Sequence, residues 1–100
     1  MIGKCDFSEG AKALEAALED GNWQVRVKTL RSLGLLKHKD GIKAIAKSLS
    51  SNISNERKEA ASALGEIASA AALPHLAAHV DDPDPDVRKN IRWALSRIAE

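Results

Sequence analysis

Apolar residues recur along the chain at a fixed interval of 31 residues. Leu14, Ile45 and Leu76 keep this interval. Four further sets keep it without a gap: Leu18, Leu49 and Val80; Arg26, Arg57 and Arg88; Leu33, Leu64 and Leu95; and Leu36, Ile67 and Ile98. Self-similarity at a fixed period of a few tens of residues is the signature of a repeat architecture. The pattern therefore predicts a protein built from three copies of one structural unit.

Each copy contains two stretches in which apolar residues lie three or four positions apart, with a short polar segment between them. This spacing predicts two helices per repeat, since the Asp, Asn, Ser, Gly and Pro of the polar segments end one helix and begin another. The expected helices span residues 9–20, 24–37, 42–49, 56–69, 73–80 and 86–99. The residues expected to point inward from the second helix are Val25, Thr29, Leu33 and Leu36. Ser54 and Asn55 are suited to cap the fourth.

The fold class that follows is all-α: an α-solenoid of three helical hairpins and six helices. We expect one domain over residues 1–100, with repeats at about 10–40, 41–71 and 72–100. The composition agrees, because 44% of the residues are apolar, 29% are charged and only 3% are aromatic. Such a balance is typical of a soluble helical protein and lacks the β-branched and aromatic enrichment of sheets.

The polar segment and the helix after it follow a recognisable motif, D-x-(D/N)-(P/W)-x-V-R and then A-x-x-A-L-G-x-I. Repeat three carries it in Asp82, Asp84, Pro85, Val87, Arg88, Ala94, Leu95 and Ile98. Repeat one carries it in Asp20, Asn22, Trp23, Val25, Arg26, Leu33 and Gly34. Repeat two departs from it, with Ser51 and Glu56 where Asp and Val are usual. In these residues the chain resembles the short HEAT-like repeats of the phycobilisome-lyase type. Ankyrin and tetratricopeptide repeats fit less well, since 31 is not the ankyrin period and the chain has no Tyr.

The resemblance implies a structural role for five charged residues at fixed repeat positions: Asp20, Asp82, Arg26, Arg57 and Arg88. In the family, the Asp caps the second helix, while the Arg bonds the turn and the neighbouring repeat. A phosphate clamp formed by the three arginines is the alternative that we favour less.

The first and last repeats differ from the middle one at positions that would face a neighbouring repeat. Arg92 corresponds to Leu30 and Ala61, and Glu15 stands where later copies have alanine. Because repeat arrays need polar outer faces at their ends, we expect a complete three-repeat unit with both ends adapted to water.

The sequence predicts neither a catalytic nor a metal centre. His75 and His79 have the i, i+4 spacing of two metal ligands, but a solvated end face explains them, so we expect no metal and no cofactor. Cys5 is the only cysteine, which excludes an internal disulfide and a cysteine-based zinc site. Nucleophile, phosphate-loop and dinucleotide motifs are missing. With no long apolar segment, we expect a cytoplasmic protein without membrane attachment.

The favoured function is a non-catalytic scaffold that binds another protein on the second-helix face, which lines the inner side of HEAT-like arrays. Residues expected there include Val27, Arg31, Lys58, Ser62, Lys89 and Trp93. We predict partner binding by Arg31, Lys58, Lys89 and Trp93, with Trp93 as the anchor and the cations favouring an acidic partner. Trp93 could instead fold back over Ile98 or Lys89.

Two alternatives remain open: a chromophore-lyase-related or enzyme-accessory protein, and a weak nucleic-acid binder. The formal net charge of only +1 disfavours the second, because phosphate-backbone binding usually needs a strongly basic face. A homodimer through one end or through the Trp93 face would bury further surface.

Overall fold

The computed structural model describes residues 12–99, so Cys5 and the first residues of the expected first helix lie outside the described part. Residues 12–17 are helical. After them come the helices α2 (Trp23–Leu36), α3 (Ile42–Lys47), α4 (Ser54–Ile67), α5 (Leu73–Ala77) and α6 (Pro85–Ala99). Three 3₁₀ turns join them: η1 (Lys39–Gly41), η2 (Ser48–Ser50) and η3 (Ala70–Ala72). Residues 12–99 contain no strand, so the all-α prediction is confirmed.

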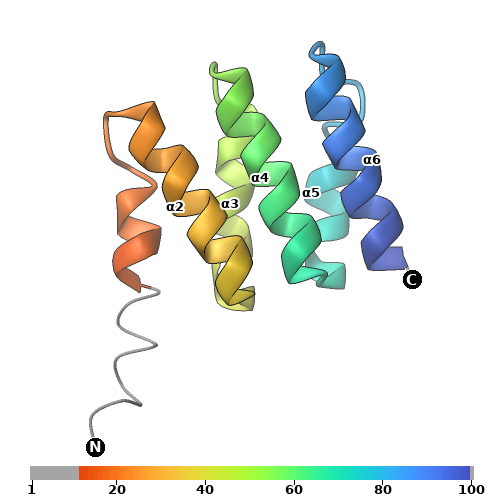
Figure 1. Ribbon diagram of the computed structural model, residues 1–100. Coiled ribbons are helices and arrows are strands. Elements are labelled where there is room, and N and C mark those ends of the chain that lie inside the picture. Colours follow the sequence, from red (N-terminus) through yellow and green to blue (C-terminus); the bar gives the residue numbers. More distant parts are fainter. Residues whose placement is uncertain (1–11, 100) are drawn as a thin grey trace, which may run out of the picture.

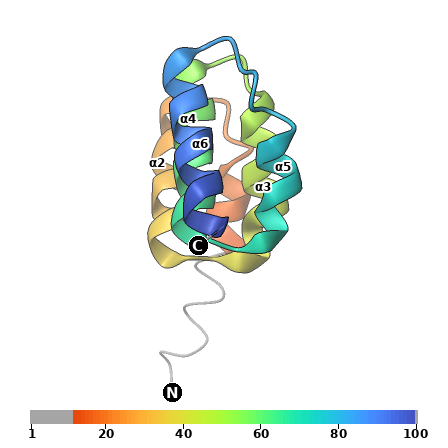
Figure 2. The same cartoon turned by 90° about the vertical axis from the view of Figure 1, so that its right-hand side faces the viewer.

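The helices form two layers. In Figure 1, α2, α4 and α6 lie side by side in chain order, with α3 and α5 behind them. Figure 2, turned by 90°, shows α2, α4 and α6 in one layer and α3 and α5 in the other. Each second helix therefore packs beside the second helix of the next repeat, and the first helices cover one side of that row. The predicted stack of helical hairpins is confirmed.

One apolar core runs between the two layers through all three repeats. Its most completely buried side chains are Leu30, Leu33, Ile45, Leu49, Leu64, Leu76, Ile91 and Val87. Five of them, Leu33, Ile45, Leu49, Leu64 and Leu76, keep the 31-residue interval, because those positions face the interior of the stack. Burial of large aliphatic side chains of this kind stabilises the fold by roughly 1.5–3 kcal/mol each.

Two glycines let the second helices approach closely. A Cβ on Gly34 would lie 2.9 Å from the Cα of Ala63, so α2 and α4 touch there through backbone. A Cβ on Gly65 would lie 2.4 Å from Cζ3 of Trp93 and 3.0 Å from Cβ of Ala94. The two glycines occupy the same repeat position, and only hydrogen fits between neighbouring helices at that point.

The helix ends differ in detail from the prediction. The first helices of repeats two and three are shorter than expected, because α3 passes into η2 and α5 ends at Ala77. Both α2 and α4 end in a left-handed residue, Lys37 and Ala68, each with φ of 55°. The predicted capping by Ser54 and Asn55 is wrong, since Ile53 occupies the N-cap of α4 and Ser54 already lies inside the helix.

Two residues predicted to point inward are exposed. Thr29 and Leu33 are buried as expected, but Val25 and Leu36 are 37% and 39% exposed. Their counterparts Val87 and Ile67 are 1% and 3% exposed. Within the described residues α2 has no preceding repeat to cover these positions, whereas α4 and α6 each follow one.

Glu15 was predicted to adapt the first repeat to water. Its carboxylate instead contacts Nε2 of His38, which lies just after α2. Both side chains are partly buried in this contact. The residue therefore links the first helix to the connection that follows the second.

Candidate interaction surface

The charged residues at the fixed repeat positions form a chain of hydrogen bonds across the three repeats, which we call the ladder. Its members are Asp20, Arg26, Ser51, Glu56, Arg57, Asp82 and Arg88. Each arginine lies in the first turns of a second helix and donates from Nη1 to a backbone carbonyl six residues earlier. The distances are 2.6 Å from Arg26 to Asp20, 2.8 Å from Arg57 to Ser51 and 2.7 Å from Arg88 to Asp82. This bond fixes the guanidinium against its own turn.

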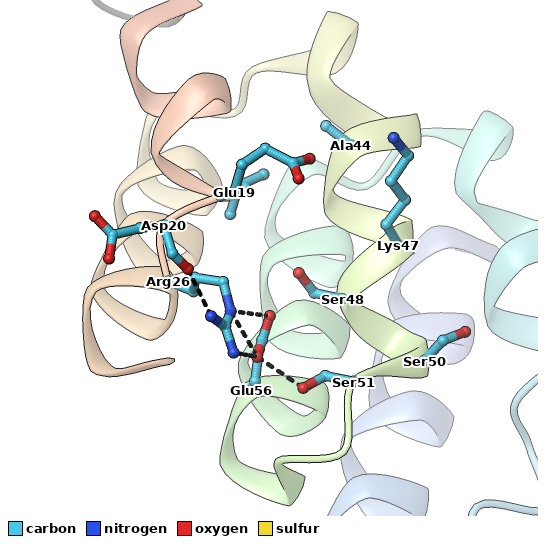
Figure 3. A pocket seen from close by; sticks show the side chains of 10 residues that line it. Glu19, Asp20, Arg26, Ala44, Lys47, Ser48, Ser50, Ser51 and Glu56 are labelled. Carbon is cyan, nitrogen blue, oxygen red and sulfur yellow. Dashed lines mark hydrogen bonds and ion pairs between the residues drawn. The ribbon is translucent and has the colours of Figure 1, made fainter. Parts of the chain in front are cut away.

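The first rung of the ladder joins repeat one to repeat two. Nε of Arg26 lies 3.0 Å from both carboxylate oxygens of Glu56, and Nη2 lies 2.9 Å from Oε1 (Figure 3). Ser51 donates its hydroxyl hydrogen to the same Oε1 at 2.7 Å. Glu56 is only 3% exposed, so this carboxylate depends on its donors for the hydrogen bonds that water would otherwise supply.

The second rung joins repeat two to repeat three. Arg57 donates from Nε to Oδ2 of Asp82 at 2.8 Å and from Nη2 to Oδ1 at 3.2 Å, a two-pronged contact. Asp82 is 7% exposed. A bidentate pair of an arginine and a carboxylate is stronger and more directional than a single ionic contact.

Repeat two reaches the same result with different residues. Ser51 takes the turn position of Asp20 and Asp82, and its Oγ accepts the amide of Ile53 at 3.0 Å. The carboxylate that Arg26 needs comes from Glu56, which stands at the position of Val25 and Val87. The two departures from the family motif therefore compensate each other. The sequence showed both departures, but it did not indicate that Glu56 replaces the carboxylate that is lost when Ser51 stands in the aspartate position.

The ladder changes the ionisation of its acids. Burial alone would raise the pKa of Glu56, but hydrogen bonds from Arg26 and Ser51 outweigh it and lower that pKa. Burial opposes ionisation of Asp82 too, and the Asp84 amide together with Arg57 lowers its pKa overall. The hydrogen bond to Glu56 raises the pKa of Arg26. Each rung is thus an ion pair at neutral pH.

The predicted arginine contacts to the turn and to the neighbouring repeat are present, but the predicted capping by aspartate is wrong. Oδ1 of Asp20 accepts the amide of Asn22, and Oδ1 of Asp82 accepts that of Asp84. The helix caps are the next residues along: Asn22 accepts from Gln24, and Asp84 accepts from Asp86. Each aspartate therefore shapes the turn two residues before the capping residue of the helix.

The second-helix face consists of Val27, Arg31, Lys58, Ser62, Lys89 and Trp93, and all six are at least partly exposed. Nη2 of Arg31 forms an ion pair with Glu59 at 3.0 Å, while its side chain stays 61% exposed. Among residues 12–99, neither Lys58 nor Lys89 has an ion-pair partner. The structure thus carries the predicted binding residues on three adjacent helices of one layer.

Trp93 is 42% exposed and packs in a way that the sequence did not predict. Its ring lies against Gly65 of α4. The guanidinium carbon of Arg97 lies 5.8 Å from the ring centroid, and Nε of Arg97 donates to the carbonyl of Gly65 at 2.9 Å. One part of the indole is fixed and the rest remains accessible.

Shallow depressions follow the boundary between α2 and α4. One, of about 230 Å³, is lined by Trp23, Val27, Arg31, Asn55, Lys58 and Glu59. Another, of about 140 Å³, is lined by Arg31, Gly34, Leu35, Glu59, Ser62, Ala63 and Glu66. They share Arg31 and Glu59, so they adjoin, and we call the two together the groove between α2 and α4. Leu35, at 73% exposure, borders it as an accessible apolar residue.

Within residues 12–99, no three His, Cys, Asp or Glu side chains lie close enough together to hold a metal ion. His75 and His79 are half-buried in and after α5. None of the helices in this part of the chain combines the length and apolar composition needed to cross a membrane.

The two-layered stack and its repeated rungs define the class of protein: an α-solenoid of stacked helical hairpins. A sequence profile described as HEAT repeats matches residues 11–96, and the chain belongs to the HEAT-repeat family. The narrower likeness to phycobilisome-lyase repeats stays a prediction.

Individual proteins show the same relationship. The chain is 38% identical over 89 residues to human deoxyhypusine hydroxylase, a match that covers 87% of this chain and 30% of that protein. The structure of the human enzyme in complex with glycerol superposes with a TM-score of 0.85 and 35% identity, covering 91% of this chain and 32% of the other. An engineered protein matches with a TM-score of 0.76 and 25% identity, over 91% of this chain and 46% of its own. The chain thus spans about a third of the hydroxylase.

Proposed function

We propose that this HEAT-repeat domain is a protein-interaction module that binds an acidic segment of a partner along the second-helix face. The observation that carries the proposal is the groove between α2 and α4, which combines apolar side chains with cations. Trp23, Val27 and Leu35 supply the apolar lining, and Arg31 and Lys58 lie beside them. Glu59 and Glu66 line the groove too, but they pair with Arg31 and Lys37, so Lys58 is left to attract an acidic residue of a segment whose apolar residues fill the groove.

The cations of this face support an acidic partner. Lys58 and Lys89 have no acidic partner within residues 12–99, and Arg31 remains largely exposed despite its pair with Glu59. An approaching carboxylate would meet positive charge from three helices. Complementary charge of this kind raises the association rate and excludes partners of the wrong sign.

Trp93 and the helix packing support tight rather than merely electrostatic binding. A half-exposed indole held by Gly65 and Arg97 loses little side-chain freedom when a partner covers it. Interface energy concentrates in such aromatic residues. A stack of packed helices is also pre-organised, so association orders few additional groups.

The test is a comparison of partner capture from native lysate. The Trp93→Ala variant should weaken binding of the captured protein at least about tenfold. The double variant Lys58→Gln/Lys89→Gln should also bind more weakly than the wild type. Its affinity should fall less steeply as the salt concentration rises, because salt screens the charge attraction that this variant lacks.

The matched control is Lys43→Gln/Lys47→Gln, which removes the same charge from the exposed side of α3. It should leave binding unchanged. Equal losses in both double variants would contradict a role for the second-helix face. Loss of the helical circular dichroism signal in Trp93→Ala would instead assign the indole to the fold.

A second candidate is an enzyme-related role, and the 38% identity to human deoxyhypusine hydroxylase favours it. The chain covers only 30% of that enzyme, so its share in such a reaction would be a part of the fold rather than the whole. Incubation with a deoxyhypusine-containing protein and mass measurement of that protein provides the test. A gain of one oxygen atom that depends on this chain would support the second candidate over the first.

A further inference from the structure

The ladder has a direction, because every rung runs from an arginine to a carboxylate of the following repeat. Arg26 of repeat one binds Glu56 of repeat two, and Arg57 of repeat two binds Asp82 of repeat three. In each rung Nη1 bonds the arginine's own turn, while Nε and Nη2 present a fork to the next repeat. The third arginine, Arg88, therefore faces the position where a fourth repeat would begin.

Arg88 is held as the other two are. Its Nη1 donates to the carbonyls of Asp82 and Pro83 at 2.7 and 3.2 Å. Within residues 12–99, no carboxylate oxygen lies within ion-pair distance of its guanidinium. The fork of Nε and Nη2 is thus oriented by the fold for a carboxylate that this part of the chain does not supply.

The opposite end of the stack offers the complementary group. Asp20 shares its turn geometry with Asp82, since each Oδ1 accepts the amide two residues ahead. Asp82 uses its carboxylate for Arg57, whereas Asp20 is exposed and no arginine side chain within residues 12–99 bonds its carboxylate. On the same turn of the stack, Val25 is 37% exposed, although its counterpart Val87 in repeat three is 1% exposed.

We propose that this chain associates head to tail with a second copy of itself, Arg88 of one copy binding Asp20 of the next. The contact repeats the existing interfaces between repeats: the fork of Arg88 takes the carboxylate as Arg57 takes Asp82, and the α5–α6 end covers Val25. A heterologous contact forms a ring only where its rotation closes and otherwise extends openly, and a contact that continues the stack of repeats extends openly. Assemblies therefore grow by whole copies as concentration rises.

The outer surface of repeat three, formed by α5 and α6, has a composition that makes this association weak and reversible. Arg92 is exposed where Leu30 and Ala61 are fully buried in the two internal interfaces. A guanidinium at this position adds little apolar burial and must keep its contact with water. The head-to-tail contact consequently depends on the ion pair to a larger extent than the internal interfaces do.

Sedimentation velocity over a concentration series tests the proposal. The wild-type chain should show a weight-average mass that rises beyond that of a dimer. Arg88→Gln and Asp20→Asn should each weaken association at least roughly tenfold, because either removes a bidentate ion pair. Asp20→Asn keeps a side-chain oxygen for the amide of Asn22, so the turn is preserved. Arg88→Lys keeps the positive charge but not the paired Nε and Nη2 donors, so it separates the effect of charge from that of the two-pronged contact. Circular dichroism confirms that each variant is folded.

Mixing the two variants gives the decisive measurement. The Asp20→Asn copy retains Arg88, and the Arg88→Gln copy retains Asp20, so an equimolar mixture should form a one-to-one dimer that grows no further. Lys43→Gln and Asp40→Asn, which change exposed charges away from both ends, should associate as the wild type does.

Three outcomes would overturn the proposal. A wild-type chain that stays monomeric at its highest soluble concentration has no such contact. An assembly that stops at a dimer in the wild type has a closed, symmetric interface. A mixture of the two variants that remains monomeric shows that Arg88 and Asp20 are not partners.

Discussion

Glu56 is the residue whose role depends most on distant parts of the chain. It precedes Arg57 in α4, yet its carboxylate serves Arg26, 30 residues earlier. Removal of either partner from a buried ion pair leaves an uncompensated charge and costs about 3–5 kcal/mol where the site is fully dry. Arg26 keeps 20% of its side chain exposed, so the cost here is lower.

The ladder makes stability depend on pH in the acidic range. The pKa values of Glu56 and Asp82 are lowered in the folded chain from ordinary values of 4.5 and 3.8. A group with a lowered folded pKa contributes its full stability above its unfolded value and loses it as pH falls through the folded value. Urea unfolding should thus give a constant free energy at neutral pH that declines below about 4.5, by up to about 1.4 kcal/mol per pH unit for each group.

The control for this prediction is Glu56→Gln/Asp82→Asn. This variant should be less stable at neutral pH and should lose part of the acid dependence, because two of the groups that take up protons on unfolding are gone. An acid slope identical to that of the wild type would contradict the assignment.

Residue-scale details of the ladder were only partly predictable. The arginines keep the 31-residue interval, and Asp20 and Asp82 lie two such intervals apart, which comparison of the repeats detects directly. The exchange between Ser51 and Glu56 was not predictable, because a repeat pattern compares equivalent positions and does not report contacts between different ones. The contact between Glu15 and His38 was not predictable for the same reason.

The second helices are the elements that set the geometry of the stack. The glycines of α2 and α4 lie where neighbouring helices touch, and the L-G pair that repeats one and two share showed their positions in advance. Helix bounds were less predictable, because the short first helices tighten into 3₁₀ turns that a pattern of apolar residues does not distinguish from α-helix. The exposure of Val25 and Leu36 depends on which neighbour each helix has, which a single repeat does not encode.

Gly34→Ala tests the contact between α2 and α4. Alanine favours a helix over glycine by about 1 kcal/mol, but its Cβ would lie 2.9 Å from backbone of Ala63. Inserting an extra methyl group into a well-packed contact lowers the free energy of unfolding by typically about 1–3 kcal/mol. We therefore expect a net loss of up to about 2 kcal/mol in the free energy of unfolding by urea, because the close atom belongs to backbone, which yields less than a side chain. Gly21→Ala is the control, since nothing lies within 4 Å of a Cβ there. A Gly34→Ala chain as stable as the Gly21→Ala chain would show that the helices separate without cost.

At the scale of the whole molecule, the three repeats share one core rather than three. The period and the order of the helices were predictable from the sequence, because stacking imposes the same requirement on every copy. The packing of Trp93 was not predictable, since its position carries Arg31 and Ser62 in the other repeats.

Removal of repeat three tests how far the stack is a single cooperative unit. A chain that ends at Ser69 exposes Ala61 and Leu64, which are completely buried in the full chain. Stability in a repeat array comes largely from interfaces between neighbours. The shortened chain should show a broad, low-temperature thermal transition by circular dichroism where the full chain unfolds sharply. A sharp transition at an unchanged midpoint would mean that repeats one and two fold without the third.

The direction of the ladder also bears on how such a gene can change. Each repeat carries its acceptor toward the preceding unit and its arginine toward the following one, whether the acceptor is Asp82 in a turn or Glu56 in a helix. Duplication or deletion of one complete 31-residue unit by recombination therefore leaves every internal rung matched. A break within a unit would separate an arginine from the turn that holds it. Inheritance by whole repeats preserves the ion pairs, and the array can change length without first losing its fold.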